Sequence, residues 1–153
     1  MTYTFAQEGF EQTYPELEPL YRQHYAEMKA RKESLGLPVS PYNPRLDQYI
    51  AAERRGDLMT LIARYDGNAI GYCNVYVTND MHNHDKIAEE DTVFVTRLHR
   101  NGVGKSLVKF GLEQLRNRGV TQLNVAALTD PRIVNLWKRM GFKEVAVQMT
   151  YVF

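Results

Sequence analysis

The sequence predicts a mixed α/β fold, in which about four helices flank a largely antiparallel central sheet. Three observations predict it: a strand that passes through a glycine turn into a helix, a β-hairpin, and a short helix with clear start and stop signals. These features occupy residues 89–115, 58–78 and 130–142. Because the length is that of one domain and no linker or repeat interrupts the chain, we expect one domain covering residues 1–153.

The N-terminal third predicts one strand and two helices. Residues 2–5 have the alternation of a short strand, and Thr13 is the expected N-cap of a helix that ends near Ser34. A second, shorter helix is expected to follow Asn43 as its cap and to end before Gly56.

The rest of the chain predicts the sheet and two more helices. Residues 58–65 and 69–78 form a hairpin across an Asp-Gly turn, and a strand beginning near Ala88 leads into the glycine turn and a helix that stops before Gly119. Residues 121–128 are expected to lie beside the Val93 strand. Residues 143–153 alternate apolar and other side chains, which predicts a closing strand.

Composition and charge exclude several classes of protein. The chain has 153 residues, of which 44% are hydrophobic and 24% charged, as in an ordinary globular domain. Nineteen basic residues against eighteen acidic ones predict no general attraction to nucleic acid or membranes. The single Cys73 excludes an intramolecular disulfide. We see neither a signal peptide nor a membrane-spanning run, and we expect a cytoplasmic protein.

The glycine turn is the strongest candidate for a ligand site. Gly102 and Gly104 allow a tight turn, and the N–H groups of the following helix can bind an anion, which His99, Arg100 and Lys105 would also favour. The spacing of the glycines matches neither the dinucleotide-binding fingerprint nor the P-loop.

Two motifs resemble the GNAT family of N-acetyltransferases. The turn is similar to the family's acetyl-CoA loop, [Q/R]-x-x-G-x-[G/A], with His99 in the first position; alternatively the loop is one residue short and Arg100 takes that position. Residues 130–142 resemble the family's N-x-x-A-x-x-L-Y-x-x-x-G-F signature, although Asp130 replaces the asparagine and Trp137 the tyrosine. The segment from Gly67 to Gly104 also looks like a group of bacteriophage acetyltransferases.

The resemblance implies acetyl-CoA as co-substrate and an amine as acceptor. It implies that the strand before the turn pairs with pantetheine, that the turn wraps the pyrophosphate, and that a backbone N–H near Val95 donates to the thioester oxygen. The implied co-substrate residues are Val93, Phe94, Val95, His99, Arg100, Asn101, Gly102, Val103, Gly104, Lys105, Ser106 and Asp130. Sheet edges and C-terminal strands often pair in this fold, so a homodimer is one expected arrangement.

Amine acetylation also requires a proton acceptor. In a regular strand, Glu89, Asp91, Val93 and Val95 would share one face, and two nearby carboxyl groups can raise one pKa toward neutrality. Asp91 is the preferred base because it is nearer the turn, Glu89 is the second candidate, and either could act through water.

The proton donor to the leaving thiolate departs from the family pattern. Many members use the signature tyrosine, but the indole of Trp137 cannot release a proton at neutral pH. Tyr151, Tyr76 or Tyr72 could replace it, or the thiolate could leave unassisted.

A rival hypothesis is a degenerate member that binds CoA or a protein partner without turnover.

Two loops, residues 34–44 and 79–87, are expected to line the acceptor pocket. The second carries His82 and His84 beside Asp80. Imidazole and carboxylate can bind a metal, but nothing else in the sequence indicates a ligand cage, so we expect no metal site.

Overall fold

A five-stranded sheet forms the centre of the computed structural model, which describes residues 2–127 and 130–153. The strand order is β1-β2-β3-β4-β5, and all neighbours are antiparallel except β4 and β5, which are parallel. The predicted mixed α/β fold is thereby confirmed. The elements are β1 (Tyr3–Gln7), α1 (Phe10–Ser34), α2 (Leu46–Arg54), β2 (Leu58–Tyr65), β3 (Asn68–Asn79), β4 (Lys86–Val95), the 3₁₀ turn η1 (Arg97–His99), α3 (Val103–Asn117), β5 (Gln122–Asn124) and α4 (Pro131–Arg139).

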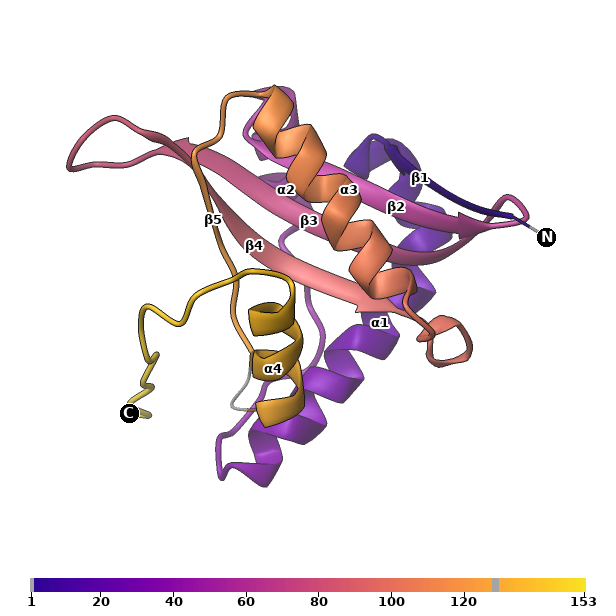
Figure 1. Cartoon of the computed structure of the whole chain (residues 1–153). Coiled ribbons are helices and arrows are strands. Elements are labelled where there is room, and N and C mark those ends of the chain that lie inside the picture. The colour runs from indigo at the N-terminus through magenta and orange to yellow at the C-terminus, as the bar shows by residue number, and fades with distance from the viewer. Residues whose placement is uncertain (1, 128–129) are drawn as a thin grey trace.

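Helices cover both faces of the sheet (Figure 1). One face packs against α3 and the other against α1 and α2; we call them the α3 face and the α1/α2 face.

A buried polar network fixes α1 on β3. The Asn74 side-chain amide donates to the Tyr21 hydroxyl at 2.7 Å, and the Thr60 hydroxyl donates to Asn74 Oδ1 at 2.7 Å. Since a buried amide without partners is costly, this network sets the position of α1.

The predicted hairpin is confirmed. β2 has the expected bounds, and its turn places Asp66 and Gly67 at φ 48° and 84°. Positive φ at both central positions is the requirement of a type I′ turn, which aspartate and glycine meet at little cost.

Both predicted N-terminal helices begin elsewhere. α1 begins at Phe10, ahead of the expected Thr13 cap, because the Glu53 carboxylate of α2 accepts hydrogen bonds from the first two N–H groups of α1. A carboxylate from another element thus does what a local cap would do. The Asn43 cap is also wrong, since α2 begins only at Leu46.

The C-terminal half differs more. β5 lies beside β4, the strand that contains Val93, as predicted, but it has only three residues and pairs with Ile87–Glu89. Part of the predicted strand over 121–128 lies outside the described residues. The predicted closing strand over 143–153 is wrong, because that segment forms no strand and is exposed. α4 is confirmed with Asp130 as its N-cap.

Among the residues that the structure describes, no helix is long and apolar enough to span a bilayer.

Candidate active site

One edge of β4 is only partly covered. β3 pairs along the whole of β4, but on the other side β5 covers only Ile87–Glu89. Residues 90–95 have no strand there among the described residues; we call this stretch the open edge of β4. Backbone groups along a strand edge can pair with an extended ligand. The predicted residues Val93, Phe94 and Val95 lie on this edge.

The open edge runs directly into the glycine turn (residues 96–102) and the N-terminus of α3. Gly102 is the N-cap, at φ 101°, a conformation that glycine adopts without strain. No side chain of the described residues caps α3, so its first N–H groups remain available to a ligand. A Cβ added at Gly102 would meet no atom within 4 Å. The turn is therefore open, and the helix dipole favours an anion there.

The side chains around Gly102 are of two kinds, exposed and buried. Asn101, Lys105 and Ser106 are exposed beside the turn, whereas the Val103 side chain is buried in the core and offers only its backbone to a ligand. A Cβ at Gly104 would lie 3.8 Å from the Val95 side chain, an ordinary contact.

Two of the predicted cations are held by protein partners. Arg100 Nε donates to the Val95 carbonyl at 2.7 Å, and its Nη2 contacts Glu27 of α1 at 2.8 Å. Burial alone would raise the pKa of Glu27, but hydrogen bonds from Arg100 and Arg97 outweigh it and lower that pKa. His99 Nδ1 pairs with the Tyr3 hydroxyl at 2.9 Å. Arg100 therefore ties the turn to α1. Exposed Lys105 has no ion pair among the described residues, so it is the better candidate for an anion contact.

A β-bulge in β4 changes which face of the sheet the side chains after Asp91 occupy. Consecutive residues of β3 pair with Glu90 and Thr92, so Asp91 is the extra residue in β4. Asp91 therefore lies on the α1/α2 face, whereas Val93 packs in the cluster of the α3 face. The expectation that Asp91 and Val93 share a face is wrong, because it assumed a regular strand.

Asp91 lies against phenol groups. Its carboxylate accepts a hydrogen bond from the Tyr49 hydroxyl of α2 at 2.8 Å. Burial raises the pKa of Asp91, and the hydrogen bond from Tyr49 partly opposes that rise. The negative charge of Asp91 adds to burial in raising the pKa of Tyr76. The predicted base is thus a partly desolvated carboxyl group with one fixed donor, an arrangement that suits a proton acceptor.

A second carboxyl group was not predicted as a site residue. Glu90 lines a narrow cavity between the α3 face, α3 and α4, together with Cys73, Val75, Val93, Val108, Gly111, Leu123, Val125 and Trp137. Burial, reinforced by the charge of Asp91, raises the pKa of Glu90 to about 7. Trp137 Nε1 is buried without a hydrogen-bond partner among the described residues. The sequence held no signal for this cavity, because the bulge and the position of α4 create it.

The other predicted residues have surroundings different from those of Asp91. Glu89 is exposed and accepts a hydrogen bond from Asn124 of β5 at 2.9 Å. Asp130 accepts from the Arg132 N–H at 3.0 Å as the cap of α4, and hydrogen bonds from Arg132 lower its pKa. Tyr151 is 80% exposed on the C-terminal segment, and no contact joins it to Asp91.

The histidine loop is exposed and held by its own hydrogen bonds. His82 Nδ1 lies 3.2 Å from Asp80 Oδ1, and His84 adopts φ 64°. Within residues 2–127 and 130–153, no group of three His, Cys, Asp or Glu side chains could hold a metal ion.

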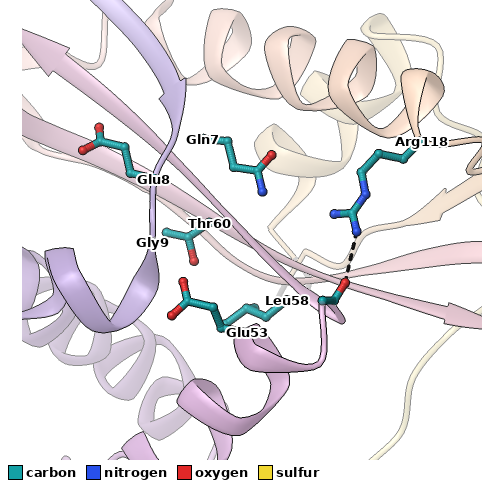
Figure 2. A pocket seen from close by; sticks show the side chains of 8 residues that line it. Gln7, Glu8, Gly9, Glu53, Leu58, Thr60 and Arg118 are labelled. Atoms are coloured by element: carbon teal, nitrogen blue, oxygen red, sulfur yellow. Dashed lines mark hydrogen bonds between the residues drawn. The ribbon is translucent and has the colours of Figure 1, made fainter.

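A roomier cavity lies elsewhere (Figure 2). It has a volume of about 510 Å³ and is lined by Gln7, Glu8, Gly9, Glu53, Gly56, Leu58, Thr60 and Arg118. Its charged groups already have structural partners: Glu53 caps α1, Glu8 pairs with Arg64, and Arg118 donates to the Gly56 carbonyl. Because it lies by the C-terminal end of α3, whereas the open edge meets the N-terminal end, it is separate from the candidate site.

The glycine turn makes a first testable prediction. Replacing Gly102 with alanine puts a Cβ on a left-handed backbone, at a cost of about 1–2 kcal/mol. We expect CoA affinity to fall about tenfold or more, measured by thermal shift against CoA concentration. Gly104→Ala should bind like the wild type, because Gly104 does not have a positive φ and a Cβ there makes only an ordinary contact. Asparagine tolerates a left-handed backbone, so Gly102→Asn shows whether a loss of affinity comes from backbone strain or from a side chain that blocks the ligand. Unchanged affinity in both Gly102 variants would contradict a ligand at the turn.

Comparisons with known proteins report on the family and the fold. The model of the acetyltransferase (GNAT) family matches residues 10–142. No curated protein sequence is similar enough to match the chain.

Similar solved structures share the whole fold. A ribosomal-protein-alanine N-acetyltransferase from Brucella melitensis biovar Abortus 2308 has a TM-score of 0.77 and 18% identity, over 100% of this chain and 99% of that one. AAC(6')-Iy in complex with the bisubstrate analogue CoA-S-monomethyl-acetylneamine has a TM-score of 0.72 and 18% identity, over 100% and 99%. An aminoglycoside acetyltransferase from an uncultured soil metagenomic sample, in complex with sisomicin, has a TM-score of 0.72 and 15% identity, over 99% and 96%. None of these three is described as a bacteriophage protein, so that resemblance stays a prediction.

Proposed function

Because this chain belongs to the GNAT family of acetyltransferases, we propose that it transfers the acetyl group of acetyl-CoA to a primary amine of a small molecule or a protein. One observation carries the proposal: the open edge of β4 continues through the glycine turn to the uncapped N-terminus of α3. This path offers backbone pairing along its length and amide N–H groups for an anion at its end. Acetyl-CoA has the matching order of groups, an amide-containing arm followed by a pyrophosphate.

The residues present fit this co-substrate. Residues 93–95 offer strand pairing to the pantetheine arm, and the first-turn amides of α3 with Lys105 offer contacts to the pyrophosphate. Arg100 supports the site by holding the Val95 carbonyl and Glu27, which keeps the turn against α1. The co-substrate supplies an activated acetyl group as a thioester.

The proposed reaction forms one bond and breaks one. The amine nitrogen attacks the thioester carbonyl carbon, so that a C–N bond forms and the C–S bond breaks. Asp91 accepts the amine proton, directly or through one water molecule, and its raised pKa brings it closer to the operating pH. The Tyr49 hydrogen bond holds the carboxylate in one orientation.

The departing thiolate takes up one proton, which balances the proton that the amine gives to Asp91. Tyr72 is fully buried and pairs with His24 Nδ1 at 3.0 Å, whereas Tyr76 is only half-buried on the same face as Asp91. Tyr76 is therefore better placed than Tyr72 to reach a substrate. Trp137 cannot release a proton, but its free Nε1–H can donate a hydrogen bond. Trp137 lies in the cavity beside Glu90. This position supports a role for the indole as a hydrogen-bond donor that stabilises negative charge, rather than as a proton donor.

The acceptor would lie on the α1/α2 face. Tyr49, Tyr72 and Tyr76 line this face around Asp91, and loops 34–44 and 79–87 are the proposed walls of the pocket. Phenol and carboxylate groups suit a polar amine, since they can accept hydrogen bonds from an ammonium group before it loses its proton.

Amine-dependent release of free CoA thiol tests the function. The assay supplies acetyl-CoA with a peptide beginning in alanine, with sisomicin, or with putrescine, and measures thiol against a control without amine. We expect at least one acceptor to accelerate release, and Tyr49→Phe to alter the pH dependence. Binding of CoA without accelerated release by any primary amine would instead favour the degenerate module.

A further inference from the structure

An unpaired piece of β2 borders the cavity of Figure 2. β1 pairs with β2 only over Leu61–Tyr65, so the first residues of β2 extend beyond it. On the opposite side of β2, the Asp57 carbonyl accepts a hydrogen bond from the Val77 N–H at 2.7 Å. Because the backbone groups of successive strand residues point to alternate sides, the N–H and C=O of Leu58 point away from β3. Leu58 lines the cavity, so these two groups face it.

The Leu58 backbone lacks a partner strand on this side among the described residues. The last hydrogen bond there runs from the Glu8 N–H to the Thr60 carbonyl at 3.0 Å, after which the chain turns into α1. Leu58 is only 5% exposed, and buried backbone groups are usually paired. An extended segment that continued the line of β1 would supply the missing pairing.

Opposite charges lie at the two ends of the cavity. Arg118 donates from Nη2 to the Gly56 carbonyl at 3.0 Å, and it has no carboxylate partner among the described residues. Glu53 lies at the other end, beside Gly9, where its carboxylate accepts hydrogen bonds from the start of α1. Gln7 and Arg118 reach into the cavity from different sides (Figure 2). The remaining guanidinium donors suit a ligand carboxylate, and the free lone pairs of Glu53 suit an ammonium group.

We propose that this cavity binds a short free peptide of two or three residues in an extended conformation. The peptide continues the direction of β1 and therefore runs antiparallel to β2. Its ammonium group then lies toward Glu53, its backbone pairs with Leu58, and its carboxylate meets Arg118. The strand from Thr60 to Gly56 spans about 13 Å, and an extended tripeptide spans about 10 Å.

The size and position of the cavity agree with this ligand. Its volume of about 510 Å³ lies within the usual range of small-ligand sites. It lies by the C-terminal end of α3, away from the glycine turn, so the inference does not depend on the proposed acetyltransferase activity.

Isothermal titration of the full chain with trialanine, in the absence of acetyl-CoA, tests the proposal. We expect one site with a dissociation constant on the order of 0.1–1 mM, as for other ligands of this size. Trialanine amide lacks the carboxylate and N-acetyl-trialanine lacks the ammonium group, so each should bind about tenfold more weakly. Equal affinity for trialanine and either modified peptide would overturn the proposal. So would the absence of both heat and a thermal shift with about 10 mM trialanine.

Two matched variants locate the peptide. Arg118→Gln keeps a donor for the Gly56 carbonyl but removes the charge, so it should lower trialanine affinity about tenfold or more. Arg116→Gln makes the same change at an exposed position two residues earlier and should bind like the wild type. Circular dichroism checks that both variants fold. Unchanged affinity in Arg118→Gln would overturn the assignment, and a loss confined to Asp91→Asn would place the peptide in the proposed acceptor site instead.

Discussion

Replacing Asp91 with asparagine is expected to lower kcat/KM for amine acetylation by about 10²- to 10⁴-fold, the usual contribution of a general base. Asparagine keeps the size of the side chain and its contact with Tyr49 but cannot accept the proton. CoA affinity should stay within about twofold of the wild type, because Asp91 points away from the face of Val93. Steady-state thiol release and a CoA titration measure the two quantities.

Glu89→Gln is the matched control for Asp91→Asn. It removes a carboxylate two residues away on the same strand, but Glu89 is exposed and hydrogen-bonded to Asn124. We expect an activity within about threefold of the wild type. A large loss in Glu89→Gln with normal activity in Asp91→Asn would assign the base to Glu89.

Glu90→Gln is expected to stabilise the protein at alkaline pH and not in acid. The folded pKa of Glu90 is about 7 against an ordinary 4.5. Between these values the folded state keeps a proton that the unfolded state has lost, so stability falls as pH rises from 4.5 to 7. A shift of this size corresponds to about 2–3 kcal/mol once partial exposure is considered. Glutamine has no charge to bury and avoids that loss.

Urea unfolding at several pH values measures the effect of Glu90→Gln. The gain in unfolding free energy should be about 2 kcal/mol at pH 8 and near zero at pH 4. Glu113→Gln, on an exposed position of α3, is the control and should change little at either pH. Equal stability of Glu90→Gln and the wild type at pH 8 would contradict a desolvated Glu90.

The local features of the fold could be predicted from sequence because local chemistry determines them. The Asp66-Gly67 turn needs positive φ at two positions, and Asp130 with Pro131 and Gly141 marks both ends of α4. The start of α1 could not be predicted, since its cap is Glu53, which lies in another helix. The prediction of a closing strand was wrong because alternation shows only that a segment can pair as a strand. It does not show that a partner strand lies within reach.

The candidate site was predictable in part. The glycine turn and the strand before it were visible as motifs, and the structure brings them together at the open edge of β4. The bulge at Asp91 was not visible, because a bulge leaves no mark on the alternation of a short charged segment. It places Asp91 on the face opposite Val93, and only three-dimensional packing reveals that burial raises the pKa of Glu90 and of Asp91.

The central claim is that the open edge of β4 and the glycine turn bind acetyl-CoA. Isothermal titration of the wild-type chain with acetyl-CoA, and separately with CoA, tests it most directly. We predict one site per chain for both ligands with a dissociation constant on the order of micromolar. Absence of binding heat together with no thermal shift for either ligand would contradict the claim.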